Sequence, residues 1–244
     1  MAKTTYDLTN LGLAAGTHSI TVRAKADGYA DSEPSNAVEY VVEEIENYLT
    51  FSSPNSFTLA TGYAAKSWNG VLEYSTDAST WNVWDGTTTL SANSGKLYLR
   101  GIGNSKLTGH ISNYKWILKG SNITCEGNIE NLLDYKTVAN GKHPAMATNC
   151  YAYMFYDCTS LTSVPALPAT TLATNCYAGM FESCTNVKLS KTKTGEYQTA
   201  YRIPVSETGT TATDAMTNMF MNTGGTFKGT PTINTTYYTS NTVV

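Results

Sequence analysis

Five cysteines and three histidines are the side chains of this chain best suited to bind a metal ion or to attack a substrate. The cysteines are Cys125, Cys150, Cys158, Cys176 and Cys184, and the histidines are His18, His110 and His143. The last four cysteines form two pairs with a spacing of eight residues, whereas zinc sites use pairs separated by about two to four residues. The histidines lie in different regions without the spacing of a ligand set. We therefore expect no metal site and no cofactor.

The cysteines are then either buried thiols or disulfide partners. A buried free cysteine behaves as a small apolar residue, so a column of thiols suits a repetitive core. An odd number of cysteines leaves one unpaired in a full disulfide scheme, because Cys125 stands outside the two pairs. We favour buried thiols and keep disulfides as the alternative.

Three carboxylates flank a tryptophan-rich stretch and suggest a different chemistry. Glu73, Asp77 and Asp85 surround residues 81–84, and glycoside hydrolysis needs a pair of carboxylates across a cleft. The spacing places them on a hairpin, where their side chains would be splayed apart and solvated. The chain contains no nucleophile elbow, zinc-protease motif or phosphate-binding loop. We predict no catalytic residues and no enzymatic activity, with a glycan-active enzyme as the disfavoured alternative.

Aromatic side chains are the best candidates for contact with a glycan or with a protein partner. They are Trp68, Tyr74, Trp81, Trp84 and Tyr156. Tyrosine and tryptophan are enriched at interfaces because each combines a large apolar ring with a polar atom. Trp81 and Trp84 would point to opposite faces of one strand, so one of them must face outward unless both faces are covered. Tyr156 is replaced by Glu182 in a second copy of its segment, which indicates exposure.

The composition restricts both the partners and the fold. The 244 residues carry a net charge of −3 and only 14% are charged, which excludes a broad basic surface for nucleic acid. Threonine, serine, asparagine and glycine supply the polarity and favour strands and turns. No apolar run reaches the roughly 18 residues of a membrane helix, and the first residues lack the apolar segment of a secretory signal. We expect a mainly β protein without membrane insertion.

Residues 1–45 have the alternation of half-buried strands. Strands are expected at 6–8, 18–25 and 37–42, where apolar and polar residues alternate. Between the last two, a glycine-tyrosine pair is followed by Ser32 and Ser35. This series resembles the C-terminal half of a fibronectin type III or bacterial Ig-like module. The front strands of such a β-sandwich are absent, so we expect a partial module that is completed by preceding sequence or by strand addition from another chain.

Residues 46–122 contain short strands at a regular spacing. An acidic stretch at 43–46 suggests a linker before them. Candidate strands lie at 57–59, 70–74, 81–84 and 96–101, separated by turns rich in aspartate, glycine and serine. A meander of this kind is typical of a small β-sandwich.

Residues 123–244 contain an internal repeat, which is the strongest pattern in the chain. Residues 149–159 recur at 175–185 with an offset of 26, and a degenerate third copy occupies 214–222. Periods of about 20–30 residues indicate a short solenoid, in which stacked units bury a shared core. The residues expected in that core are Cys150, Met154, Phe155, Cys158, Cys176, Met180, Phe181, Cys184, Met219 and Phe220.

The recurring Met-Phe, Cys-Thr and Leu-Pro elements of this region are similar to the BspA-like leucine-rich repeats of bacterial surface proteins. In combination with an Ig-like module, they resemble surface and prophage-encoded proteins of gut bacteria. The resemblance implies an extracellular, non-enzymatic binding protein with a leucine-rich-repeat-type solenoid at its C-terminal end.

We therefore expect a protein for binding or display at a virion surface or at a cell surface. The lack of a signal peptide in this chain favours a phage virion component, such as a fibre, a capsid decoration or an adhesion module. The alternative is a fragment of a secreted bacterial cell-surface adhesin. Expected partners are other protein chains, including copies of itself or virion neighbours, and a glycan of the host surface.

Overall fold

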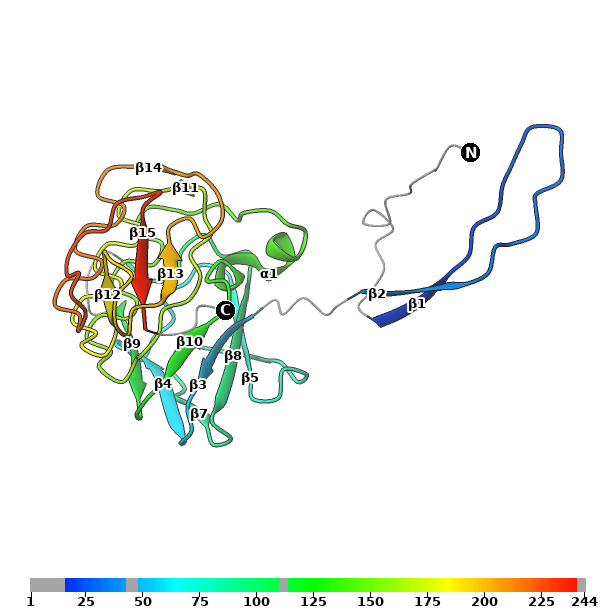
Figure 1. Ribbon diagram of the computed structural model, residues 1–244. Coiled ribbons are helices and arrows are strands. Elements are labelled where there is room, and N and C mark those ends of the chain that lie inside the picture. The colour runs from blue at the N-terminus through cyan, green and yellow to red at the C-terminus, as the bar shows by residue number, and fades with distance from the viewer. Residues whose placement is uncertain (1–15, 43–47, 110–113, 241–244) are drawn as a thin grey trace. The chain divides into compact units, whose positions relative to one another are not determined.

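The structure is a computed structural model that describes residues 16–42, 48–109 and 114–240 (Figure 1). The chain divides into two compact units, 1–46 and 47–244, and each is described by itself. The described residues are mainly β, with several antiparallel sheets and one short helix, so the expected fold class is confirmed at this level. None of the helical residues described forms a segment long and apolar enough to cross a membrane.

The first unit is a single antiparallel hairpin. Strands β1 (Gly16–Ile20) and β2 (Val38–Val42) pair along their whole length. Beyond them, serine side chains continue the ladder: the Val22 amide donates to Ser35 Oγ at 3.0 Å, and the Ser35 amide donates to the Val22 carbonyl at 2.9 Å. Ser32 makes the same pair of bonds with Ala24. The strand expected at 6–8 lies outside the described residues.

The described side chains of this hairpin have no core of their own. Val22 is 50% exposed and Val38 is 66% exposed, and the other described side chains are half-buried or exposed. A two-stranded ribbon of this kind is at best marginally stable in water.

Two antiparallel sheets of the second unit share one core. The larger sheet has the order β10 (Thr124–Glu126), β3 (Leu49–Ser52), β8 (Lys96–Ile102), β5 (Val71–Ser75) and β6 (Asn82–Val83). The smaller sheet has the order β7 (Leu90–Ala92), β4 (Phe57–Thr61) and β9 (Trp116–Lys119). Burial alternates along β3, β4 and β8, as expected for strands with one face on a core.

The repeated sequence forms three equivalent stretches, which we call repeat segments 1 (149–158), 2 (175–184) and 3 (214–222). Each is a run of overlapping β-turns in which every second amide donates to the carbonyl three residues earlier, as from Met154 to Tyr151 at 3.1 Å. Every fourth residue has a left-handed backbone, at Asn149, Tyr153, Asp157, Asn175, Gly179, Ser183, Asp214, Asn218 and Asn222. Glycine, asparagine and aspartate tolerate that conformation best, which explains why they dominate these positions.

The remaining amides link one repeat segment to the next. The Tyr151 amide donates to the Cys176 carbonyl at 2.8 Å, and the Tyr177 amide donates to the Ala215 carbonyl at 2.7 Å. Among the described residues, four such bonds join segments 1 and 2 and four join segments 2 and 3, and each series begins with one bond to the residue just before the next segment, Thr174 or Thr213. Intra-segment turns and inter-segment bonds together satisfy the buried backbone, which lets so irregular a chain path lie inside the protein.

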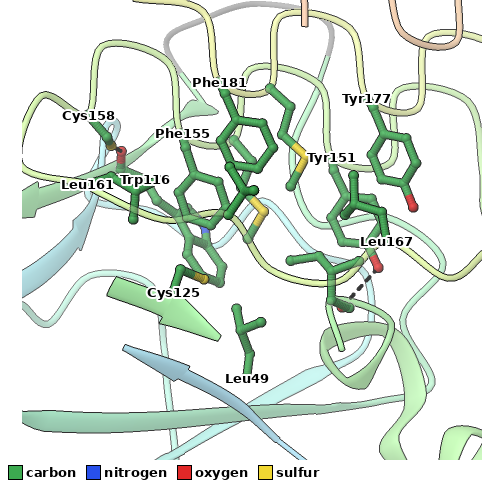
Figure 2. Close-up of a cluster of buried hydrophobic side chains, with 14 of the residues drawn as sticks. Leu49, Trp116, Cys125, Tyr151, Phe155, Cys158, Leu161, Leu167, Tyr177 and Phe181 are labelled. Atoms are coloured by element: carbon green, nitrogen blue, oxygen red, sulfur yellow. Dashed lines mark hydrogen bonds between the residues drawn. The ribbon is translucent and has the colours of Figure 1, made fainter. Parts of the chain in front are cut away.

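Side chains at equivalent repeat positions lie above one another (Figure 2). The ring centroids of Phe155 and Phe181 are 5.5 Å apart, and those of Phe181 and Phe220 are 5.4 Å apart, with nearly parallel planes. Tyr151 and Tyr177 form a second stack at 5.5 Å. All ten residues expected in the repeat core are buried, with at most 4% exposure.

All five cysteines are free and buried, which agrees with the favoured prediction of thiols. Burial raises the pKa of the Cys158 thiol to about 11 and that of Cys176 to about 12. The same cause raises the pKa of the other three well above the ordinary value. Thiols that stay protonated are poor nucleophiles and poor metal ligands, so these side chains serve as core residues.

The expected boundary near residue 122 does not divide the structure, because residues 47–244 form one compact unit. Strand β10 pairs with β3 on one side, while residues around it make parallel bridges to the repeat region through Ile123–Leu161 and Asn128–Ala166. The Phe155 ring lies 6.1 Å from the Trp116 ring of β9. Sheet and repeat segments therefore share a continuous core.

Most of the remaining elements also contribute residues to this core. Helix α1 (Asn131–Ala139) packs on β8, and Gly101 permits the approach because any Cβ there would collide with the Leu132 carbonyl. Parallel strands β11 (Thr171–Leu172) and β14 (Thr210–Thr211) extend repeat segments 2 and 3. Strands β12 (Leu189–Ser190), β15 (Thr236–Thr239) and β13 (Thr199–Arg202) form a small antiparallel sheet.

Candidate functional site

Two of the tryptophans expected to contact a partner are core residues. Trp84 is 1% exposed and Trp68 is also buried, with the two ring centroids 5.0 Å apart. The Trp84 indole Nε1 donates to the Thr88 carbonyl at 2.8 Å, and its amide donates to the Leu72 carbonyl, so Trp84 continues the pairing of β6 with β5 and lies opposite the buried Leu72. The prediction that Trp68 and Trp84 offer rings to a ligand is therefore wrong. An indole whose single donor is paired inside the protein is stabilised as a core residue.

Trp81 lies on the opposite, outer side of the large sheet, beside Arg100. The guanidinium carbon of Arg100 is 3.9 Å from the Trp81 ring centroid and 4.4 Å from the Tyr135 ring centroid. Arg100 Nε also donates to Glu73 Oε2 at 2.7 Å, because β5 and β8 pair with these two residues opposite each other. The arginine is thus held between two rings and a carboxylate, which are its favourable contacts in proteins.

Further tyrosines surround this arrangement. The Tyr48 ring centroid is 5.8 Å from that of Trp81 and 5.0 Å from that of Tyr98. We call the set the aromatic face, and its members are Tyr48, Glu73, Trp81, Tyr98, Arg100 and Tyr135. All six are half-buried, so part of each remains open to solvent.

Sequence reasoning identified only Trp81 and Glu73 of the aromatic face. The alternation of residues 96–102 could have identified two more members. Leu97 and Leu99 point to the core, so Tyr98 and Arg100 lie on the outer side of the sheet. The pairing of β8 with its neighbours, which the sequence does not reveal, then brings these residues next to Glu73.

The other two expected contact residues lie elsewhere. Tyr74 is half-buried and packs against the core cluster. Tyr156 is half-buried on repeat segment 1, with Lys115 Nζ 5.1 Å from its ring centroid and the Tyr153 ring 6.0 Å away. Neither belongs to the aromatic face.

Asp77 and Asp85 each close a turn. Asp77 Oδ1 accepts the Ser79 amide at 2.8 Å and the Thr80 amide at 2.7 Å, and these bonds lower the pKa of its carboxyl. Asp85 Oδ1 accepts two amides at 2.9 Å, from Thr87 and Thr88, and its pKa falls to about 2. Both carboxylates stay ionised at neutral pH and fix local backbone, a role that aspartate commonly has in turns.

A buried carboxylate that sequence reasoning did not single out stands in front of α1. Glu130 is 1% exposed, and its Oε2 lies 2.8 Å from Nδ1 of His143. Its Oε1 has no hydrogen-bond partner among the described residues. Burial raises the pKa of the Glu130 carboxyl, and His143 opposes the rise. The two residues are 13 positions apart and form no known motif, so spacing alone gives no signal for this pair.

Glu130 and His143 line a pocket of about 350 Å³. Its other walls are Pro144, Ala145, Met146, Ala169, Thr170, Thr171 and Ala173. Among the residues that the structure describes, no three histidine, cysteine, aspartate or glutamate side chains gather as a metal ligand set.

No known protein-family model, curated protein or solved structure matches this chain.

Proposed function

We propose that the protein is a non-catalytic binding or display protein of a surface, and specifically a phage virion component. The support is the repeat, in which Met-Phe and Cys-Thr recur at a constant offset, together with an Ig-like sequence pattern. This combination resembles surface and prophage-encoded proteins. The position of the gene tests the assignment. Neighbouring virion structural genes are expected, whereas an adjoining signal peptide and wall anchor would favour a bacterial adhesin instead.

The repeat segments are, in this proposal, a short solenoid of the BspA-like leucine-rich-repeat type. The observation in favour is the stack of equivalent rings, since Phe155, Phe181 and Phe220 recur at intervals of 26 and 39 residues and lie at nearly equal separations. Stacked units that bury one another's apolar residues define solenoid proteins. The sheet of the same unit then covers one end of the stack.

The aromatic face is the proposed contact surface for a glycan of the host. Its half-buried rings suit the apolar C–H side of a sugar, and Glu73 and Arg100 supply an acceptor and donors for hydroxyl groups. This combination of flat apolar surface and few polar groups is the single observation that carries the glycan proposal.

A glycan array tests this proposal. Wild-type protein is expected to bind a subset of glycans, and Trp81→Ala is expected to abolish the signal. Tyr29→Ala is the matched control, because Tyr29 is an aromatic residue of the first unit with 81% exposure. Near-ultraviolet circular dichroism checks that both variants are folded. Equal binding by wild type and Trp81→Ala would remove the aromatic face from consideration.

The hairpin of the first unit is the proposed attachment point for another protein chain. Its apolar side chains, such as Val22 and Val38, are exposed within the described residues, and a two-stranded sheet offers two edges for strand addition. The partner is a virion neighbour or a second copy of the chain. Sedimentation of the full chain distinguishes the two, because self-completion predicts a mass above that of a monomer.

A further inference from the structure

The backbone hydrogen bonds between repeat segments 2 and 3 extend into the residues that precede both segments. The equivalent bonds before segments 1 and 2 are missing among the described residues. Upstream of segment 3, the Thr210 amide donates to the Thr170 carbonyl at 2.8 Å, and the Ala212 amide donates to the Leu172 carbonyl at 3.1 Å. These bonds make up the β11–β14 ladder. One repeat earlier, the equivalent donors are the amides of Thr171 and Ala173.

The equivalent acceptors for those two amides are the carbonyls of Pro144 and Met146. Neither bond forms within the described part of the chain. The donors follow from Thr210 and Ala212 by the offset of 39, and the acceptors follow from Thr170 and Leu172 by the offset of 26. All four residues instead line the pocket of about 350 Å³. The pocket therefore lies at a gap in a backbone ladder, lined by the residues of the two missing donors and of the two missing acceptors, and the Ala173 amide lies beside the Cys176 thiol.

The chain around residue 146 is held away from segment 2 by other contacts. The Ala147 amide donates to the Ser105 carbonyl at 2.8 Å, and His143 is bound to Glu130. Both contacts tie this stretch to elements outside the repeat, which keeps the gap open. An occupant that restores the ladder must be an extended backbone, since only that presents donors and acceptors alternately on both of its edges.

The buried carboxylate of Glu130 favours an occupant with a positively charged side chain. Glu130 is the one carboxylate among the lining residues and is buried, and its Oε1 has no donor in the part of the chain that the structure describes. A carboxylate can accept several hydrogen bonds, so Glu130 has capacity for a further donor beside His143 and Asn128. The neighbouring walls of Pro144, Met146 and Ala173 are apolar and suit a methylene chain.

We propose that this pocket binds an extended peptide segment of a partner protein, inserted beside β11, with a lysine side chain directed to Glu130. The peptide backbone accepts from the Thr171 and Ala173 amides and donates to the Pro144 and Met146 carbonyls. The lysine stem lies on the apolar walls, and its ammonium group donates to the Glu130 carboxylate. The site uses none of the six residues of the aromatic face, so it stands whether or not the glycan proposal is correct.

Nuclear magnetic resonance titration of the full ¹⁵N-labelled chain tests the proposal. The probes are the capped peptide acetyl-Ala-Ala-Lys-Ala-Ala-amide and two matched peptides, one with glutamine and one with Nε-acetyl-lysine at the central position. The lysine peptide is expected to shift the Thr171 and Ala173 amide signals in a saturable manner. It is expected to bind at least about tenfold more tightly than either matched peptide, the range expected for a charge-assisted hydrogen bond.

Protein variants separate the charge from the backbone contribution. Glu130→Gln is expected to remove the preference for lysine over glutamine, while Glu126→Gln, on β10 outside the pocket, is expected to keep it. A lysine peptide methylated at its central amides is expected to bind at least about tenfold more weakly, because it cannot donate to the carbonyl wall. The acetyl-lysine comparison uses wild-type protein and remains decisive if Glu130→Gln does not fold.

Two results would overturn the proposal. Equal affinity of the three unmethylated peptides for the wild-type protein would show that Glu130 does not select an ammonium group. Signal shifts confined to residues outside the pocket, or no saturable shift at about 10 mM peptide, would show that the gap in the ladder does not take up a strand.

Discussion

The hairpin of the first unit and the repeat segments of the second are both held by backbone hydrogen bonds between neighbouring stretches of chain. Their side chains differ, because those of the hairpin are exposed or half-buried and those of the repeat core are buried. In the hairpin, regular pairing from Gly16 to Ile20 leaves Val22 and Val38 at least half exposed. In the repeats, the backbone turns at nearly every residue, yet the Phe155–Phe181–Phe220 stack is fully buried. From this comparison we expect that a hydrogen-bond ladder defines the path of a chain, while buried, stacked side chains provide most of its stability.

Thiol reactivity should give the largest contrast between the two regions. The five native cysteines are buried and protonated, so reaction with a thiol reagent requires unfolding of the second unit. We expect a rate at least about 10³-fold below that of a free thiol, in keeping with the usual stability of a domain. Thr21→Cys in the hairpin should add one thiol that reacts at nearly the free rate. A native cysteine that reacts as fast as the introduced one would contradict this view of the repeats.

Truncation in the phenylalanine stack is expected to have the next largest effect. Phe181 lies between Phe155 and Phe220, so Phe181→Ala removes two ring contacts and leaves a cavity. We expect a loss of about 3–5 kcal/mol in the free energy of unfolding, measured by urea denaturation. Phe181→Leu should cost clearly less, because it fills most of the space. A loss below about 1 kcal/mol for the alanine variant would mean that the stack does not stabilise the unit.

Arg100→Gln tests the aromatic face as a structural contact. The substitution removes the ion pair with Glu73 and the contacts of the guanidinium with Trp81 and Tyr135. We expect the free energy of unfolding to fall by about 1–2 kcal/mol, since these contacts are partly shielded from water. Arg23→Gln in the exposed hairpin is the control and should change stability by no more than about 0.5 kcal/mol. Equal effects of the two substitutions would show that Arg100 is no better supported than a surface arginine.

Glu130→Gln should change how stability depends on pH. Burial raises the pKa of this carboxyl in the folded state, so folding favours its protonated form. The stabilisation by the protonated carboxyl is fully present below the unfolded-state pKa of about 4.3. It is lost as pH rises through the raised pKa of the folded state. We therefore expect the glutamine variant to be more stable than wild type at pH 7, with the difference shrinking below about pH 4.3. Urea denaturation between these pH values gives the profile, and an unchanged difference would contradict it.

The smallest effect is expected in the hairpin itself. Val38 is 66% exposed, so Val38→Ser removes little apolar contact within the chain. We expect a change of at most about 0.5 kcal/mol in the unfolding of the second unit. If the same urea experiment gives a loss above about 1 kcal/mol, Val38 packs against this chain in solution and the contrast between the two regions disappears.

The sequence predicts the repeat region best because its information is local and periodic. The offset of 26 places Phe155 and Phe181 at equivalent positions, and the structure stacks them. Prediction was weakest where one strand meets several neighbours. Alternation over 81–84 correctly places Trp81 and Trp84 on opposite faces, but the pairing with β5 decides that Trp84, opposite the buried Leu72, is the one in the core. Alternation separates the two faces of a strand and does not say which face meets the core.

The two functional candidates depended on long-range pairing to different degrees. The aromatic face was partly visible in the alternation over 96–102, whereas its assembly needed the register between Glu73 and Arg100. The Glu130–His143 pair was invisible to spacing, because the chain between them forms a helix with a kink at Asp134 and a loop that no motif describes.

By itself, the sequence determined a mainly β chain, the phase of the repeats and the residues of the repeat core, because strand alternation and repeat offsets are local properties of residue order. Only the tertiary structure decided that strand β10 joins sheet and repeats in one unit, and that the ladder between segments 1 and 2 breaks at Pro144 and Met146. Those outcomes depend on which distant backbone groups find each other. Every residue except proline carries the same backbone donor and acceptor, so local sequence patterns do not reveal which distant groups pair.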